Sequence, residues 1–222
     1  MNFLELCQFV LDEGDQVGAN MTTVLVTSES PEIQRNVVRW IQQAYARIQR
    51  RGRFWKFHRK NGVLIATDGS QDYVKSSVLR VLADSIQIRL VGETSSTPMT
   101  FLTYKQWRDL FNGVELTAGY PRWFTELSQG KFRLTPDPDP NRVFEILADW
   151  YIKSHVLEND DDSPIWDEDL HELVAWEALK YFALEYEASE TLGKRVTLAL
   201  PGLWQEMFDR YLPEFEITGE FA

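Results

Sequence analysis

One cysteine and three histidines are all that this 222-residue sequence offers for disulfides and for soft metal ligands. Cys7 cannot form an intrachain disulfide, and no Cys-x-x-Cys pair is present that could bind zinc. His58, His155 and His171 have no second ligand at metal spacing. His171 follows Asp167 by four residues on an expected helix, a spacing that fits a metal pair but more often marks an ordinary side-chain contact. We therefore expect no metal site.

Enzyme motifs are missing as well. Residues 62–70, GVLIATDGS, contain no Gly-Lys-Ser/Thr and do not form a phosphate-binding loop, and no Gly-x-Ser-x-Gly elbow occurs. The acidic run 158–163 lacks the central glycine and final glutamate of a calcium loop, so a solvated acidic loop before a helix explains it better. We expect no catalytic residue, no cofactor and no enzyme. A small enzyme without a recognisable site is the weakest alternative.

Long apolar runs and an excess of positive charge are also absent. No segment approaches the roughly 18–20 apolar residues of a membrane helix, and the N-terminal residues lack a signal-peptide pattern, so we expect no membrane partner. The formal net charge is −11, the opposite sign to that of a protein that neutralises phosphates. The basic cluster at 47–60 is either a stacking patch for nucleic acid or, as we favour, the cationic end of a helix followed by inward-facing aromatics.

Helical periodicity dominates the first fifty residues. Residues 2–13 place apolar side chains three and four positions apart, and residues 31–50 sustain that period for more than four turns. Ser30, Pro31 and Glu32 match an N-cap, a first-turn proline and a first-turn acid. The apolar stripe of this longer helix comprises Ile33, Val37, Trp40, Ile41, Ala44, Tyr45 and Ile48.

The middle of the sequence changes to the period of strands. We expect a short helix at 105–113 and a hairpin in which Ser128, Gln129 and Gly130 join two strands. Pro136, Pro138 and Pro140 remove alternate amide donors, so the ladder should stop there, giving either a blunted sheet edge or a plain connecting loop. The expected strands cover 62–68, 85–92, 97–104, 121–127, 131–136 and, as a long strand that closes the sheet, 141–156.

The last third is helical again. One helix begins near Asp167, and a second covers about 188–211, which Pro201 should break, kink or restart. The pattern predicts an α+β fold in which a helical bundle carries a β-rich insertion made of a small antiparallel sheet and a hairpin. The expected parts are 1–52 and 157–211 for the bundle, 53–156 for the insertion, and 212–222 for a C-terminal arm.

The arm is too apolar for a tail left in water. It alternates apolar residues with glutamates in an extended pattern. It either folds back on its own domain or becomes ordered when it binds another chain. The residues expected to make such a contact with a partner or an adjacent subunit are Tyr211, Leu212, Phe215, Ile217 and Phe221.

Three motifs carry a family resemblance when they are taken in order. The first is W-x-x-x-A-x-x-x-I-Q from Trp40, the second is F-W-K-F at 54–57, and the third is G-x-P-x-x-F-x-x-x-x-x-G-x-x-x-L-x-P-x-P from Gly119. Each motif alone is weak, and none is catalytic. Their order, within residues 2–212, resembles the head-to-tail adaptor (head completion) family of tailed bacteriophages.

The resemblance implies a structural virion protein that assembles in the host cytoplasm. Proteins of this kind form homo-oligomeric rings, typically dodecamers, beneath the portal protein and extend the DNA channel towards tail, nozzle or tail-tube proteins. Phage DNA would pass through without specific binding, for which acidic walls are suited. The implied arm would reach towards portal. The alternative within the same neck is a tail-completion or tail-terminator protein.

Overall fold

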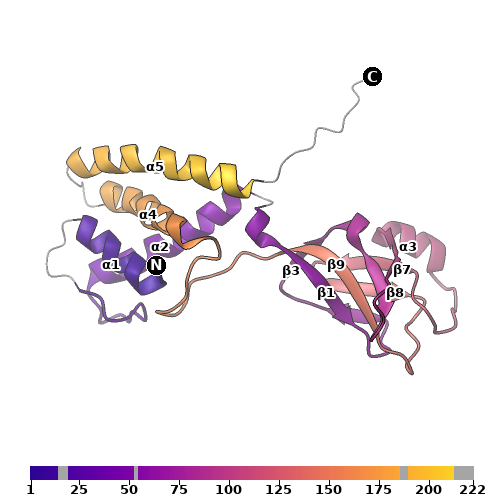
Figure 1. Cartoon of the computed structure of the whole chain (residues 1–222). Helices are drawn as coiled ribbons and strands as arrows, with labels where there is room; N and C mark the ends of the chain where they lie inside the picture. Colours follow the sequence, from indigo (N-terminus) through magenta and orange to yellow (C-terminus); the bar gives the residue numbers. More distant parts are fainter. Residues whose placement is uncertain (15–19, 53–54, 186–189, 213–222) are drawn as a thin grey trace, which may run out of the picture. The chain divides into compact units, whose positions relative to one another are not determined.

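The computed structural model describes residues 1–14, 20–52, 55–185 and 190–212 of the chain. It divides into two compact units, each considered by itself (Figure 1). Residues 1–57 and 154–222 make up the helical unit, and residues 58–153 make up the β-rich unit. The predicted α+β class is confirmed, because helices and sheets occupy separate segments of the chain.

The helices of the helical unit begin where the sequence provides caps or proline. Asn2 and Glu5 form a capping box at the start of α1, with Glu5 N donating to Asn2 Oδ1 at 2.8 Å. α2 starts one residue later than predicted: Pro31 occupies the N-cap position, and Ser30 Oγ accepts instead from Thr27 N. The described α-helices of this unit are α1 (Phe3–Glu13), α2 (Glu32–Arg51), α4 (Glu172–Glu185) and α5 (Glu190–Tyr211), with the 3-10 helix η3 (Glu168–Leu170) before α4.

The core of the helical unit contains the predicted stripe of α2. Trp40 is 1% exposed, and its ring meets Phe182 of α4 edge to face with centroids 5.7 Å apart. Trp40 Nε1 donates to Glu185 Oε2 at 3.1 Å, so the polar end of the indole is also satisfied. Every residue of the stripe is buried except Ile33, which is half-buried against the same core.

An aromatic side chain closes the C-terminal end of α2. Trp55 is completely buried, donates from Nε1 to the carbonyl oxygen of Ile48 at 3.1 Å, and packs against Gly52. The last carbonyls of a helix have no partner within the helix, so this bond satisfies one of them. Phe57 stacks on Trp55 with centroids 5.5 Å apart. The aromatic residues of 54–57 that the structure describes therefore turn inward, as the favoured interpretation predicted.

Two segments distant in sequence are joined at Gln49. Its side chain is 2% exposed, and it donates from Nε2 to His155 O at 2.9 Å and accepts from His155 N at 2.8 Å. Gln42 adds a bond from Nε2 to Leu157 O at 3.0 Å. These bonds, here called the glutamine clamp, fix the chain where it re-enters the helical unit after the insertion.

Pro201 does not interrupt α5. The helix is continuous from Glu190 to Tyr211, so a break or a restart at Pro201, two of the three expected effects, was wrong (Figure 1). Pro201 lies on the exposed face, as does Thr197, whose carbonyl loses its helical donor. Water can satisfy that carbonyl, which is why the proline is tolerated there.

The first sheet of the β-rich unit is organised around its longest strand. β9 (Phe144–Ile152) buries alternate residues as predicted, but it lies at the centre of the sheet and does not close it. β1 pairs along one edge of β9, while β4 and β3 share the other edge. The remaining strands of this sheet are β1 (Arg59–Ala66), β3 (Val78–Val81), β4 (Gln87–Leu90) and β5 (Thr97–Pro98).

The predicted hairpin is confirmed, but it is part of a wider sheet. β7 (Trp123–Ser128) and β8 (Lys131–Thr135) are joined through Gly130 at φ 71°, and β6 and β2 flank them. β6 (Thr100–Leu102) runs parallel to β7, whereas β2 (Asp72–Val74) is antiparallel to β8. The hairpin therefore does not project alone.

The proline run after β8 connects the two sheets. The ladder ends at Thr135, as the prolines predicted, and the amide and carbonyl groups left between them pair elsewhere. Asp137 O accepts from Gly119 N at 2.8 Å, and Asp139 N donates to Gly119 O at 3.0 Å. Both sheets contribute to one core, to which α3 (Tyr104–Phe111) adds no buried residue.

Replacing Trp40 with alanine should lower the free energy of unfolding of the helical unit by about 3–5 kcal/mol, because a large buried ring is removed. Urea denaturation followed by circular dichroism measures this. Leu198→Ala is the matched control: Leu198 is 81% exposed on α5, so its loss should change stability by about 0.5 kcal/mol or less. Equal stabilities of the two variants would contradict the packing described for α2.

Alanine substitution at Gly52 and at Gly193 should have opposite effects on the free energy of unfolding. A Cβ at Gly52 would clash with the indole ring of Trp55, so Gly52→Ala should destabilise by about 1–3 kcal/mol. A Cβ at Gly193, inside α5, meets nothing within 4 Å, so Gly193→Ala should stabilise by about 0.4–1 kcal/mol. Thermal unfolding of both variants tests the pair. A neutral Gly52→Ala would show that Trp55 does not close α2.

Candidate functional site

Charge is distributed unevenly between the two units. Residues 1–57 and 154–222 contain 23 acidic and 11 basic residues, a formal net charge of −12, whereas residues 58–153 contain 11 acidic and 12 basic residues, a net charge of +1. The acidity of the chain therefore belongs to the helical unit. Against that background, the outer face of α2 carries five arginines and one glutamate.

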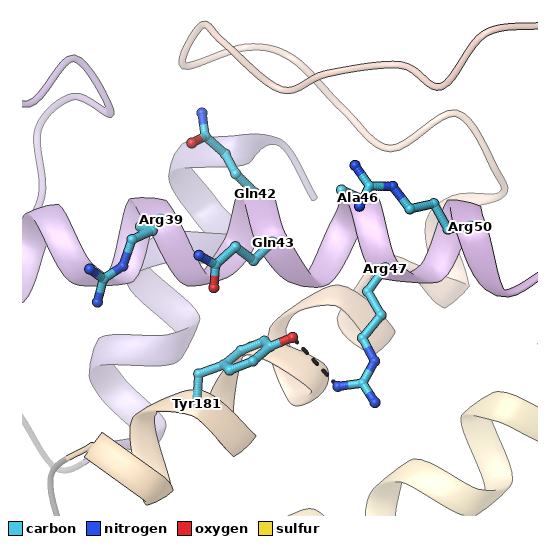
Figure 2. A pocket seen from close by; sticks show the side chains of 7 residues that line it. All are labelled: Arg39, Gln42, Gln43, Ala46, Arg47, Arg50 and Tyr181. Carbon is cyan, nitrogen blue, oxygen red and sulfur yellow. Dashed lines mark hydrogen bonds between the residues drawn. The ribbon is translucent and has the colours of Figure 1, made fainter.

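The exposed face of α2 and Tyr181 of α4 form an open groove of about 720 Å³, here called the arginine groove (Figure 2). Figure 2 shows Gln43 and Arg47 pointing towards Tyr181, while Gln42 and Arg50 point to the other side of the helix. Ala46 lies between the two glutamines and the two arginines along the helix, and its short side chain leaves space in the groove. The groove is lined by Arg39, Gln42, Gln43, Ala46, Arg47, Arg50 and Tyr181.

The arginines of this face differ in how far their charge is compensated. Arg39 forms an ion pair with Glu185 at 3.1 Å, with both side chains about half exposed. Arg47 Nη1 donates to Tyr181 Oη at 3.5 Å, a contact that raises the pKa of Arg47. Within the described ranges, Arg35 and Arg50 form no ion pair. The groove therefore retains uncompensated positive charge at its Arg50 end.

The acidic run 158–163 uses its carboxylates to hold the fold. Asp160 Oδ1 accepts from Val24 N at 2.6 Å and from Thr23 Oγ1 at 3.0 Å. Asp162 Oδ2 accepts from the backbone amides of residues 159 and 158, which lower the pKa of Asp162. Asp160 and Asp162 therefore hold this part of the chain, a structural role that the predicted solvated acidic loop did not include.

A second groove, of about 430 Å³, lies beside η3 and is here called the acidic groove. His171 lines it, but its ring is bound to backbone: Nε2 lies 3.0 Å from Trp166 O, and Nδ1 lies 2.7 Å from Met1 O. Among the residues that the structure describes, no three His, Cys, Asp or Glu side chains form a group that could hold a metal ion. The acidic groove is lined by Met1, Asn2, Glu5, Asp161, Ser163, Trp166, Glu168 and His171.

The residues expected to contact a partner from the arm divide into two groups. Tyr211 is 9% exposed, accepts from Asp167 N at 2.9 Å and packs edge to face on Phe57. Tyr211 thus belongs to the helical core and not to an arm. Leu212, 37% exposed, comes directly after the end of α5. Phe215, Ile217 and Phe221 lie outside the described residues.

Sequence reasoning missed an apolar surface on the β-rich unit. Leu110, Val114 and Leu116 are 58%, 52% and 42% exposed at and after the end of α3. α3 itself rests on the sheet through Trp107, whose Nε1 donates to Thr135 Oγ1 at 2.9 Å, and through Phe111, whose ring meets Trp123. The short amphipathic period of 105–113 was the available signal, but it does not tell which side faces solvent.

Charged grooves on one unit and an exposed apolar surface on the other are features of a protein that acts through contacts with other macromolecules. No described helix is both long and apolar enough to span a bilayer. The class defined by these features is a structural assembly protein.

A family model described as SU10 adaptor protein matches residues 1–220. Because the match covers nearly the whole chain, the chain belongs to this family of phage head-to-tail adaptors, and the resemblance carried by the three motifs is confirmed. It is a structural protein of the virion, and membership implies contacts with portal and tail proteins and a role other than catalysis. A comparison with curated proteins finds no match.

Cys7 should not react with thiol reagents in the native protein. Its side chain is fully buried in α1, and burial, assisted by the carboxylate of Asp160, raises the pKa of the thiol. Ellman's reagent should therefore leave the thiol unmodified in buffer and titrate it fully in denaturant. Reaction at equal rates in the two conditions would show that α1 is not packed as described.

Proposed function

We propose that this chain forms a ring beneath the portal and extends the DNA channel towards the tail. The observation that supports this most directly is the family match over residues 1–220, since head-to-tail adaptors connect these two parts of the particle. By the resemblance, the ring is a dodecamer. The β-rich unit would contact tail, nozzle or tail-tube proteins, and the virion is the final location.

The charge of the helical unit supports passage of DNA without adhesion. If copies of this unit surround a channel, each contributes a formal net charge of −12, which repels a phosphate backbone. The cationic cluster at 47–60 does not oppose this proposal. Within this cluster Arg51 lies over Trp204 at 4.1 Å, so part of its positive charge is already engaged inside the unit.

We also propose that residues 212–222 contact portal or an adjacent copy. Phe215, Ile217 and Phe221 alternate with glutamates in the sequence, which suits an extended segment added to a groove or a sheet edge. Tyr211 is held by Asp167 N and Phe57 and therefore belongs to the helical core. Removing residues 213–222 should leave the helical core intact.

Negative-stain electron microscopy of the full chain mixed with portal of the same phage tests the ring. Twelvefold rings or capped portal particles are the expected result, whereas sixfold rings would indicate a tail terminator. A variant that ends at Leu212 should keep the circular dichroism spectrum of the full chain and lose capture on portal.

A matched variant separates the apolar side chains from the length and charge of the arm. Phe215→Ser, Ile217→Ser and Phe221→Ser keep every glutamate and should also lose portal capture, because the apolar contact is removed. If both variants bind portal as tightly as the full chain, the arm makes no contact there. A full chain that ignores portal and stays monomeric would overturn the adaptor ring itself.

A further inference from the structure

Basic and acidic residues are separated within the helical unit. Of its 11 basic residues, seven fall between positions 35 and 56, while 17 of its 23 acidic residues fall between 158 and 220. We propose that the arginine groove of one copy binds the acidic groove of a second copy of this chain. The inference rests on the proposed function, because it assigns the contact between neighbouring subunits of the ring.

The arginine groove has the chemistry to bind carboxylates. Arg47 and Arg50 lie one turn apart on α2, and each guanidinium can bind a carboxylate with two parallel hydrogen bonds. The exposed Gln43 adds an amide donor on the side of Arg47, and the short side chain of Ala46 allows another surface to approach closely (Figure 2). Arg50 has no ion pair among the described residues, so a partner would complete it.

The acidic groove presents the matching groups. Glu168 and Glu5 have side chains that are 86% and 60% exposed, and Asp161 lines the same groove from the loop before η3. Glu5 also accepts from Asn2 N at 2.9 Å, which fixes its carboxylate at the rim. The Met1 amino group, 3.3 Å from Glu168, offsets only part of this charge.

The two grooves share no residue and lie at different places on one compact unit. Tyr181 of the arginine groove lies within α4, and His171 of the acidic groove directly precedes that helix. Ten residues separate them, which corresponds to about 15 Å along a helix axis. A contact between two different patches of the same chain is heterologous, and such contacts generate closed rings or open filaments. A pair of like grooves, by contrast, would place equal charges together.

A second copy fits the arginine groove better than nucleic acid does. The groove belongs to a unit of net charge −12, which disfavours the approach of a phosphate backbone. Arg39 is already paired with Glu185, so the arginines of the groove without an ion pair among the described residues are Arg47 and Arg50, which lie one turn apart on α2. The complementary acidic groove is present on every copy.

Charge reversal tests the contact in the full-length protein. Sedimentation velocity at low salt should show concentration-dependent self-association of the wild-type chain, weakened at about 1 M salt, where the Debye length is about 3 Å. The double variant Arg47→Glu with Arg50→Glu should raise the dissociation constant at least about tenfold. Asp161→Lys with Glu168→Lys should do the same, since neither carboxylate caps a helix.

Mixing the two double variants gives the sharper result. Each has two grooves of like sign and should not self-associate, but an equimolar mixture should assemble, because every groove then meets one of opposite sign. A control with Lys105→Glu and Arg108→Glu changes the net charge as much as the arginine variant, on exposed positions of α3, and should associate like wild type. Circular dichroism confirms that all variants are folded.

Three outcomes overturn the proposal. These are a wild-type chain that stays monomeric at every concentration, double variants that assemble like wild type, and a mixture that gains nothing. Fluorescence anisotropy with a labelled DNA duplex tests the alternative ligand. If the arginine variant loses DNA binding while its self-association is unchanged, the arginine groove binds the phosphates of nucleic acid and not a second copy. Portal capture by wild type judges the adaptor role separately, so either proposal can fail while the other stands.

Discussion

The helical unit depends on the junction between two segments that the β-rich insertion separates. The side-chain amide of Gln49 is almost completely buried. It donates a hydrogen bond to the carbonyl oxygen of His155 and accepts one from the backbone N–H of His155. Leaving either group unpaired would cost about 1–3 kcal/mol, so the glutamine clamp strongly favours one path for the returning chain. That path carries Trp166 to Tyr45 and Phe57, where rings from both segments pack with centroids 5.2 and 5.3 Å apart. The insertion can therefore differ from the bundle in fold without loosening it.

Closure of α2 and exposure of its arginines are two consequences of one amphipathic helix. The inner face buries Trp40 and its neighbours, and Trp55 satisfies a terminal carbonyl at the end of the same helix. The outer face is then left with basic residues in a unit that is otherwise acidic. If the proposed ring surrounds a DNA channel, this sorting would combine a net negative charge that does not retain DNA with a local positive face for an acidic protein surface.

The β-rich unit gains its shape from pairings between distant strands. β9 reaches across one sheet to three partners, and the hairpin of β7 and β8 is completed by two short strands. The chain passes between the two sheets before and after β2, again between β5 and β6 at buried Met99, and finally through the proline run. As a result the hairpin is embedded, whereas Leu110, Val114 and Leu116, at and after the end of α3, are exposed to solvent.

The sequence by itself determined the elements with a long periodic pattern: α2 from its apolar stripe and β9 from its alternating apolar residues. It also predicted the turn at Gly130, from the position of this glycine between two strands. It did not predict β2 or β3, because strands of three and four residues carry too little pattern and exist only through pairing with β8 and β9. The effect of Pro201 was predicted from local backbone geometry alone. The helix α5 continues through Pro201 because this residue lies on the solvent-exposed side. The grooves were also beyond the sequence. Tertiary packing alone brings Tyr181 beside Arg47 and Asp161 beside Glu5, because contacts between residues more than a hundred positions apart leave no trace in local spacing.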